Sequence, residues 1–414
     1  MSIGLFRKLA TRSNPVPLPG GCLGWCAALL LLGGCKDGVG PDPDVDWSCD
    51  TPGFVTADGN QIPVAPGGYA AVGNQIISAA TCQPMRFVGV SRPSLAFTPD
   101  GSRLGVDTAA AADFSRIRSW KANTVRIELA QYYLVNKSRF YDPTYAERVD
   151  RVVKQARAAG LQVIIALQHS DRGDPNYANF SPTSQTNMHQ PMADRAHSIP
   201  FWQELAARYK GDGGIIYELY SEPFPIGGPG GFSNWELWQN GGTHPADNVY
   251  EPRAAFQAVG MQELYDVVRA TGAHNLVIVN GTQWGYNLEQ IPARRVKGYN
   301  IAYGTHPWGD PEQTTRQPST WEKEWMFLAA TDPVMVTEFG EFETCRVEYA
   351  RAVLDQADRL GISWIAWAWQ APGAADSKEQ VRGAPICEFP MLLSDWGGTP
   401  TRLGQVVKDR LASY

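Results

Sequence analysis

The chain has 414 residues and a formal net charge of −6, from 36 lysine and arginine against 42 aspartate and glutamate side chains. Because a surface that follows nucleic-acid phosphates needs an excess of basic residues, neither nucleic acid nor an anionic membrane surface is an expected partner. Hydrophobic residues make up 43% of the sequence, enough for a large buried core, which excludes a disordered chain. Frequent glycine (41), proline (30) and tryptophan (14) favour long ordered loops that carry aromatic rings.

Residues 1–34 have the pattern of an export signal. Basic side chains precede an apolar run over residues 23–32, which ends in Leu32-Gly33-Gly34-Cys35. This resembles a bacterial lipoprotein signal, in which Cys35 is lipidated and becomes the first residue of the mature chain. An uncleaved membrane anchor is less favoured, because an apolar run of about 10 residues is shorter than the about 20 that a bilayer requires. We expect an exported protein that is held at the bacterial cell envelope only through the lipid on Cys35, or is released from it, with residues 35–48 as a flexible tether.

Four cysteines follow Cys35, at positions Cys49, Cys82, Cys345 and Cys387. An even number in an exported chain favours disulfides, for which three pairings are possible. We expect Cys49–Cys82 and Cys345–Cys387, because the members of each pair are close in sequence; buried free thiols are the alternative. No CxxC or HExxH motif occurs, so neither a zinc site nor any other metal or cofactor is expected.

From about residue 85 onward, short apolar β-rich runs alternate with amphipathic helical stretches, which predicts a parallel sheet with helical crossovers. Eight runs are expected to be strands: Met85–Val90, Thr124–Leu129, Gln162–Leu167, Gly214–Tyr220, Asn275–Asn280, Ile301–Thr305, Val334–Thr337 and Ile362–Trp367. Helices are expected at Asp107–Lys121, Thr144–Ala159, Ile199–Tyr209, Arg253–Ala270 and Arg346–Arg359, and three of them are followed by a glycine that can end a helix, at Gly160, Gly272 and Gly361.

This order of elements favours an α/β fold, a (β/α)₈ TIM barrel over residues 85–414. A doubly wound sheet fits less well, because no GxGxxG motif opens a helix after the first strand. Residues 49–84 are expected to form a short N-terminal extension, a strand pair or cap of the barrel stapled by its disulfide.

The active sites of such barrels lie at the C-terminal ends of the strands. Two of these ends carry carboxylates, in Ile215-Ile216-Tyr217-Glu218-Leu219-Tyr220-Ser221-Glu222-Pro223 and in Val334-Met335-Val336-Thr337-Glu338-Phe339-Gly340. Two carboxylates across a barrel mouth can hydrolyse a glycosidic bond, since one protonates the leaving oxygen while the other attacks or activates water. Taken singly, each glutamate could simply be a polar residue that solvates the end of its strand.

Together the two segments resemble the cellulase family (glycoside hydrolase family 5), over roughly residues 85–400. Tyr217-Glu218 through Glu222-Pro223 is similar to that family's acid/base segment, and Thr337-Glu338-Phe339-Gly340 is similar to its nucleophile segment. Their separation matches placement on the fourth and seventh strands. The resemblance implies a retaining mechanism in which Glu222 is the acid/base and Glu338 is the nucleophile.

Three further positions follow the family pattern. Arg126 matches the strand-two arginine that supports the nucleophile electrostatically, although a buried arginine could also be a structural ion pair. His306 matches the strand-six histidine that lines the cleft, and Trp367 matches the strand-eight tryptophan under the sugar at the cleavage point. Independently of the resemblance, Trp284 lies in the loop after strand five, where its ring could stack on a sugar or pack locally.

Three positions depart from the family pattern. Ser221 stands where the family has an asparagine that binds the sugar 2-hydroxyl, so slower cleavage of a glucan or a different sugar is expected. Gln168 aligns with the usual strand-three histidine and His169 follows it, and strand alternation would let only one of the two face the site. Trp308 replaces a tyrosine that commonly donates to the nucleophile, and its indole N–H could still donate at a different reach.

The sequence thus predicts a retaining glycosidase that cleaves β-1,4-linked polysaccharide and is endoglucanase-like or mannanase-like. The alternatives are a catalytically weakened barrel that binds glycan at the cell surface, and a transglycosylase with the same site. We expect a monomer whose partner is a polysaccharide or oligosaccharide. The two carboxyl groups are expected about 5 to 5.5 Å apart. The pKa of Glu222 should be raised by burial and by the charge of Glu338, which Arg126 keeps ionised.

Overall fold

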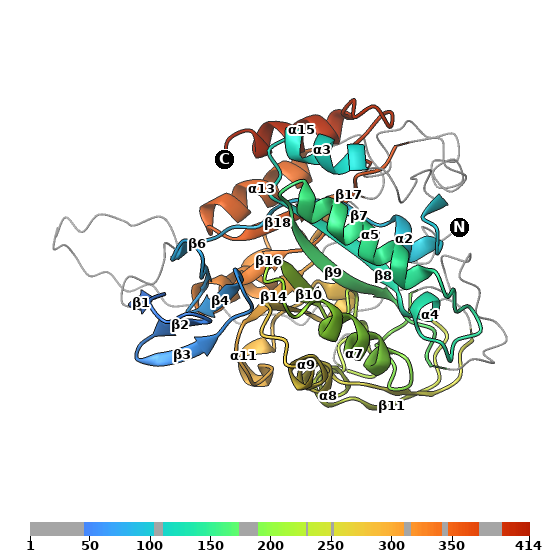
Figure 1. The fold of residues 1–414 in the computed structure, drawn as a ribbon. Helices are drawn as coiled ribbons and strands as arrows, with labels where there is room; N and C mark the ends of the chain where they lie inside the picture. Colours follow the sequence, from blue (N-terminus) through green and yellow to red (C-terminus); the bar gives the residue numbers. More distant parts are fainter. Residues whose placement is uncertain are drawn as a thin grey trace, which may run out of the picture.

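A closed barrel of eight parallel strands forms the centre of the molecule (Figure 1). The computed structural model describes residues 45–102, 111–173, 189–228, 231–249, 252–309, 316–341, 347–371 and 391–414. The barrel strands are β7 (Val88–Arg92), β8 (Thr124–Ala130), β9 (Gln162–His169), β10 (Ile215–Glu218), β13 (Val277–Asn280), β14 (Ile301–Thr305), β16 (Val334–Val336) and β18 (Ser363–Ala366). They pair in chain order, and β18 returns to β7. The predicted (β/α)₈ barrel is confirmed, and each strand overlaps a predicted one.

Helices cover the outside of the barrel because their apolar residues recur at helical spacing. In α5 (Tyr145–Ala158), for example, Val149, Val152, Val153 and Ala156 form one buried stripe. The other long helices are α3 (Ala111–Ser119), α7 (Ser198–Tyr209), α9 (Met261–Ala270), α13 (Glu348–Arg359) and α15 (Arg402–Leu411). Shorter ones are α2 (Ser94–Phe97), α4 (Gln131–Leu134), α8 (Trp235–Asn240), α10 (Thr282–Gly285), α11 (Ile291–Arg294), α12 (Trp321–Glu324) and the 3₁₀ helix η2 (Met326–Ala330). In the described part of the chain, no helix has the length and apolar character needed to cross a membrane.

The predicted helix ends are confirmed, whereas one predicted helix start is wrong. Gly160, Gly272 and Gly361 follow α5, α9 and α13 with φ of 79°, 81° and 67°, a left-handed conformation that ends a helix at little cost for glycine. The helix predicted over Arg253–Ala270 begins only at Met261. Its first part instead forms β12 (Phe256–Ala258), which pairs with β11 (Gly242–His244), because backbone pairing there overrides the helical pattern.

The N-terminal extension consists of two small antiparallel sheets. One contains β1 (Trp47–Ser48), β2 (Phe54–Ala57) and β3 (Asn60–Pro63), and the other β4 (Tyr69–Val72), β5 (Gln75–Ser78) and β6 (Gln83–Pro84). The predicted Cys49–Cys82 disulfide is present, with a Cα–Cα distance of 5.7 Å. β1 lies at the end of the predicted tether, residues 35–48. Residues 1–44 with Cys35, and likewise Cys345 and Cys387, lie outside the described residues.

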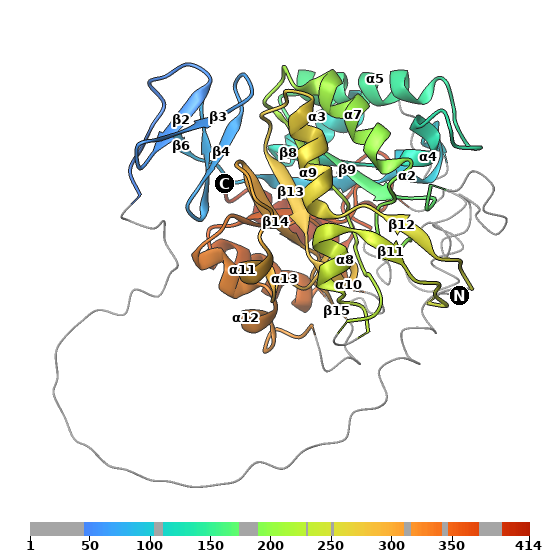
Figure 2. The ribbon, with the colours of Figure 1, turned by 90° about the horizontal axis from the view of Figure 1, so that it is seen from below.

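The second sheet of this extension closes the N-terminal end of the barrel. Its side chains share one buried cluster with residues of the barrel interior, which comprises Tyr69, Ile76, Phe87, Ile164, Ile216, Leu276, Ile278, Ala302, Met335 and Ile365. Gly213 lies so close to this extension that a Cβ would sit 2.3 Å from Cα of Gly68. Figure 2 shows the extension (blue) on the side of the molecule away from β11 and β12. The C-terminal ends of the strands are therefore left as the open end of the barrel.

Candidate active site

The guanidinium of Arg126, on β8, is the centre of a polar cluster at the open end of the barrel. It is fully buried, with Nε 2.6 Å from Oε2 of Glu218 and Nη1 2.7 Å from Oε1 of Glu338. Nη1 also donates to Oε1 of Glu128 at 2.7 Å, and Nη2 donates to Oγ of Ser221 at 2.6 Å. Burial alone would lower the pKa of Arg126, but the surrounding carboxylates raise it, so the guanidinium stays charged.

Glu218, the last residue of β10, is held by two donors. Besides Arg126, Nδ2 of Asn280 donates to its Oε1 at 2.6 Å, and the same amide donates to the backbone oxygen of Ser221 at 2.6 Å. Burial raises the pKa of Glu218, but the charge of Arg126 and the contacts with His306 lower it further, to about 2. Glu218 is therefore a fixed negative charge that holds Arg126 in place.

Glu222 and Glu338 face each other on either side of His306. One carboxylate oxygen from each glutamate and one ring nitrogen of His306 all lie within 4.8 Å of one another. Nδ1 of His306 is 3.3 Å from Oε1 of Glu222 and 3.7 Å from Oε2 of Glu338. Nε2 of the same ring is 3.0 Å from Oγ1 of Thr337. The close approach of the two carboxylates is consistent with the short separation expected for a retaining pair.

The pKa shifts of the two glutamates run in the opposite directions to the predicted ones. Burial raises the pKa of Glu222, but hydrogen bonds from His189, whose Nδ1 is 3.1 Å from Oε2, and from His306 lower it well below its usual value. Burial raises the pKa of Glu338 to about 8, with His306 and Arg126 opposing the shift. The pKa of His306 is raised to about 9 because the glutamates outweigh its burial. The predicted shifts considered only Glu222, Glu338 and Arg126. They left out His189, whose hydrogen bond lowers the pKa of Glu222.

The two candidates on strand three both lie near the site. Oε1 of Gln168 accepts from Nη2 of Arg126 at 3.2 Å. Nδ1 of His169 is 3.0 Å from the backbone oxygen of Ala96, and its ring lies edge-on to that of His189, with centroids 5.6 Å apart. Gln168 therefore contacts the central arginine directly, whereas His169 lies beside His189. The register of β8 and β9 shifts beside Gln168, so strict strand alternation does not hold at this point.

The predicted aromatic residues separate into two groups. Trp308 and Trp367 lie together at the mouth, with ring centroids 5.6 Å apart and planes inclined at 66°. Nε1 of Trp367 donates to Oε1 of Glu128 at 3.0 Å. Trp284 is half-buried and stacks on Phe224, with centroids 4.6 Å apart and planes at 15°. Its ring is therefore at least partly engaged in packing of the loop after β13.

Sequence reasoning missed four polar residues of the site. Glu128 could have been found, because it lies two residues after Arg126 on one strand and so shares its face. Asn280 could also have been noticed, since it ends β13 at the open end of the barrel. Ser91 on β7 donates to Glu128 at 2.5 Å, and His189 contacts Glu222 from a loop. For these two no periodic signal exists in the sequence.

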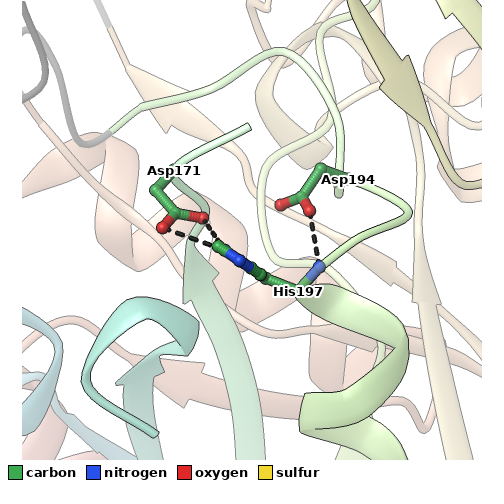
Figure 3. Close-up of side chains that lie close together, drawn as sticks. All are labelled: Asp171, Asp194 and His197. Atoms are coloured by element: carbon green, nitrogen blue, oxygen red, sulfur yellow. Dashed lines mark hydrogen bonds and ion pairs between the residues drawn. The ribbon is translucent and has the colours of Figure 1, made fainter. Parts of the chain in front are cut away.

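A second buried cluster, of Asp171, Asp194 and His197, lies near the end of β9 (Figure 3). Nδ1 of His197 is 2.8 Å from Oδ1 of Asp171, and its backbone N–H donates to Oδ1 of Asp194 at 2.8 Å. Oγ of Ser170 donates to the other oxygen of Asp194 at 2.8 Å, and the amide of Gln131 donates to both aspartates. A cation could be held only after these hydrogen bonds were broken, so the cluster is best explained as a brace between β9 and α7.

The sequence profile of one family, Cellulase (glycosyl hydrolase family 5), matches residues 79–373. The chain belongs to this family. The match covers the whole barrel and both segments on which the resemblance was based, so the predicted family is confirmed.

The individual relatives share only 21 to 26% of their residues with this chain over the aligned segments. Endoglucanase Z of Dickeya dadantii is 26% identical over 192 residues, which cover 46% of this chain and 34% of that protein. Cellulase CelDZ1 of Thermoanaerobacterium sp is 22% identical over 300 residues, 69% of this chain and 65% of that protein. The chain thus spans less than two thirds of the length of these curated relatives. The β-glucanase SdGluc5_26A of Saccharophagus degradans, solved in complex with cellotetraose, shares the fold, with a TM-score of 0.61 at 21% identity over 84% of this chain and 93% of that chain.

Proposed function

We propose that this protein is a retaining glycoside hydrolase that cleaves β-1,4-linked polysaccharide by double displacement. Glu338 attacks the anomeric carbon while Glu222 protonates the leaving oxygen, and Glu222 then takes a proton from the water that releases the sugar. The observation that carries the proposal is the approach of these two carboxylates to within 4.8 Å of one another beside His306. A separation near 9 Å would instead leave room for the water of an inverting enzyme.

The proton arrangement of the free site differs from the reactive one only in where one proton sits. With Glu338 and His306 protonated and Glu222 ionised, the three groups carry as many protons as in the reactive state, in which Glu222 holds the proton of Glu338. His306 lies between the two carboxylates, with Nδ1 at 3.3 and 3.7 Å from them, and can pass that proton across. A sugar that displaces His189 from Oε2 of Glu222 favours the transfer, because this contact lowers the pKa of Glu222.

The proposed substrate is a β-glucan or a related polymer such as mannan. Curated relatives of this chain are named endoglucanase and cellulase, and a structural relative binds cellotetraose. The hydroxyl of Ser221 accepts from Arg126 and is fully buried, so it does not replace the amide with which the family binds the 2-hydroxyl. We therefore expect slower turnover than in a family member with asparagine, or a sugar whose 2-position is recognised differently.

The test is product analysis with β-glucan, mannan and xylan oligosaccharides, comparing the wild type with Glu338→Gln. We expect cleavage with retention at the anomeric carbon, seen by NMR as initial release of the β-anomer, and its loss in the variant. Glu324→Gln is a matched control, since Glu324 is a buried glutamate bound by Tyr286 and Thr320 away from Arg126. Initial release of the α-anomer would contradict the mechanism. Binding of every oligosaccharide without cleavage would favour the binding-only barrel, and products longer than the substrate would favour a transglycosylase.

We also propose that the protein is exported and anchored to the cell envelope through a lipid on Cys35. The pattern of residues 1–35 supports this, and the Cys49–Cys82 disulfide is typical of an oxidising compartment. Labelling cells with radioactive palmitate should mark the wild type and leave Cys35→Ala unlabelled. Equal labelling of both would refute the anchor.

A further inference from the structure

The buried cluster contains a third carboxylate that the proposed reaction does not use. Glu128 lies on β8 next to the nucleophile's side of Arg126, and its Oε1 accepts from three groups: Oγ of Ser91 at 2.5 Å, Nη1 of Arg126 at 2.7 Å and Nε1 of Trp367 at 3.0 Å. We propose that Glu128 is a positioning residue, which ties the Trp367 ring to Arg126 and competes with Glu338 for the charge of that arginine. This inference rests on the proposed glycosidase function and deepens it.

The geometry couples Glu128 directly to the nucleophile. Oε1 of Glu128 and Oε1 of Glu338 each lie 2.7 Å from the same nitrogen, Nη1 of Arg126. One N–H group donates toward each oxygen, so the two carboxylates share one guanidinium edge, while Glu218 occupies Nε and part of Nη2. Three carboxylates thus surround one positive charge, and all of them are at most 3% exposed. Repulsion among them is screened very little at such a site.

Hydrogen bonding decides which of the two carboxylates ionises first. Glu128 receives three donors on one oxygen, whereas among the described residues Glu338 receives Nη1 of Arg126 and a contact of 3.7 Å from His306. Burial raises the pKa of Glu128, and Arg126 and the Ser91 hydroxyl act against that shift. Because three donors bind the ionised form of Glu128, we infer that it holds its negative charge in preference to Glu338. In agreement, the charge of Glu128 is among the causes that raise the pKa of Glu338 to about 8. Glu128 therefore sets how readily the nucleophile becomes anionic.

The same carboxylate fixes the orientation of the tryptophan at the mouth. The Trp367 indole donates to Glu128, and its ring lies against that of Trp308. An indole held by one N–H bond and one ring contact keeps the face that it offers to a sugar in a single position, which saves ordering entropy on binding. All three donors bind Oε1 of Glu128, and no described side chain donates to its Oε2.

The charged groups around Glu128 come from several strands. Arg126 lies on the same strand, Glu218 and Glu222 follow from β10, His306 from β14 and Glu338 from β16. Ser91 on β7, Gln168 on β9 and Trp367 after β18 are neutral. A substitution at Glu128 that keeps the shape and removes the charge therefore changes the field at Glu338 without removing a cation. Glu128→Gln is that substitution, because its amide oxygen can still accept from Ser91, Arg126 and Trp367.

The test compares wild type, Glu128→Gln, Glu128→Ala and the control Glu324→Gln. The pH dependence of kcat/KM and the separate values of kcat and KM are measured on the polysaccharide that the wild type cleaves. Since the pair needs one shared proton, which is lost as Glu338 ionises with a pKa of about 8, this ionisation gives the alkaline limb of kcat/KM. Glu128→Gln should move that limb about one pH unit or more toward acid, with KM changed about twofold or less. Glu128→Ala should also raise KM about tenfold, because it frees the Trp367 ring. Glu324→Gln should leave the limb in place.

A second readout does not depend on hydrolysis. The titration of Glu338 is followed by NMR in protein labelled with ¹³Cδ-glutamate and assigned with Glu338→Gln. We expect Glu128→Gln to lower the titration midpoint of Glu338 whether or not a substrate has been found. If only the glycosidase proposal fails, the wild type cleaves no substrate, but the difference in the Glu338 midpoint between the two proteins remains. If Glu128→Gln unfolds more easily but leaves both the alkaline limb and the Glu338 midpoint unchanged, Glu128 is only a structural ion-pair partner and the inference is overturned.

Discussion

Replacing Arg126 by lysine tests whether the geometry of the guanidinium, rather than its charge, organises the site. Arg126 makes polar contacts through all three nitrogens to groups from β7, β8, β9, β10 and the segment after β16. A lysine ammonium keeps the charge, but its three donors lie on a single nitrogen. It cannot bind both carboxylate oxygens of Glu218 and reach Glu338 as well. Several buried carboxylates then lose their donor.

The expected cost follows from the burial of these partners. Breaking a buried ion pair costs about 3 to 5 kcal/mol, because it leaves an uncompensated charge out of water. We expect Arg126→Lys to lower the free energy of unfolding by about 3 kcal/mol or more and to lower kcat/KM about 100-fold or more, since the nucleophile loses its Nη1 donor. The measurement is urea unfolding followed by tryptophan fluorescence, with the slope m checked for equality between proteins.

Arg295→Lys supplies the matched control. Arg295 makes a comparable two-pronged contact with Asp332, with Nε 2.9 Å from Oδ1 and Nη2 2.7 Å from Oδ2, but its side chain is 42% exposed. Exposed pairs contribute up to about 1 kcal/mol, so this variant should stay within that range and keep its activity. Equal losses of stability in the two lysine variants would refute the argument that burial and geometry at Arg126 decide the effect.

Two further predictions concern pH and the disulfide. Glu218, with a pKa lowered from 4.5 to about 2, adds stability that is lost as pH falls from 4.5 toward 2, and His306, with a pKa raised from 6.5 to about 9, adds stability that is lost as pH rises from 6.5 through 9. Glu338, with a pKa raised from 4.5 to about 8, adds stability that is lost as pH rises from 4.5 through 8. The urea midpoint should therefore be highest near pH 4.5 and fall toward pH 9, less steeply in Glu338→Gln, which lacks this carboxyl group. A midpoint that rises from pH 6.5 to 9 would contradict this. Cys49→Ser with Cys82→Ser opens a loop with a sequence separation of 33 and should cost about 2 to 4 kcal/mol in unfolding free energy, unless an unchanged midpoint shows that the N-terminal sheets do not unfold with the barrel.

The barrel could be predicted because its signals are local. Each strand is a short apolar run bounded by turns, and each long helix buries one stripe, so alternation alone fixes the order of elements. The prediction of Arg253–Ala270 as one helix shows the limit of that reasoning. Residues before Met261 have side chains compatible with a helix, but their backbone pairs with β11, a partner that no local pattern reveals.

The site was predictable only as far as strand ends reach. Glu222 and Glu338 were found because strands four and seven place them at the same end of the barrel, and Arg126 implies Glu128 through a spacing of two. His189 was not predictable, since it enters from a loop and loops have no period. The raised pKa of Glu338 was not predictable either, because it depends first on how deeply the folded chain buries this carboxyl group and then on the other carboxylates that lie near it.

That surplus of carboxylates is itself informative about the purpose of the cluster. Buried ion pairs rarely stabilise a fold more than apolar residues of the same volume would. A buried cluster with more acids than bases stabilises the fold even less, because its carboxylates repel one another. Glu128, Glu218 and Glu338 share the single guanidinium of Arg126, and at this site burial raises the pKa of Glu338 and the carboxylates raise the pKa of His306. A sugar that brings hydroxyl donors to these oxygens would relieve the repulsion and allow Glu338 to ionise at lower pH. The nucleophile would then be released by the substrate on which it acts, and the urea midpoint should rise on adding a bound oligosaccharide more at pH 9 than at pH 6.5.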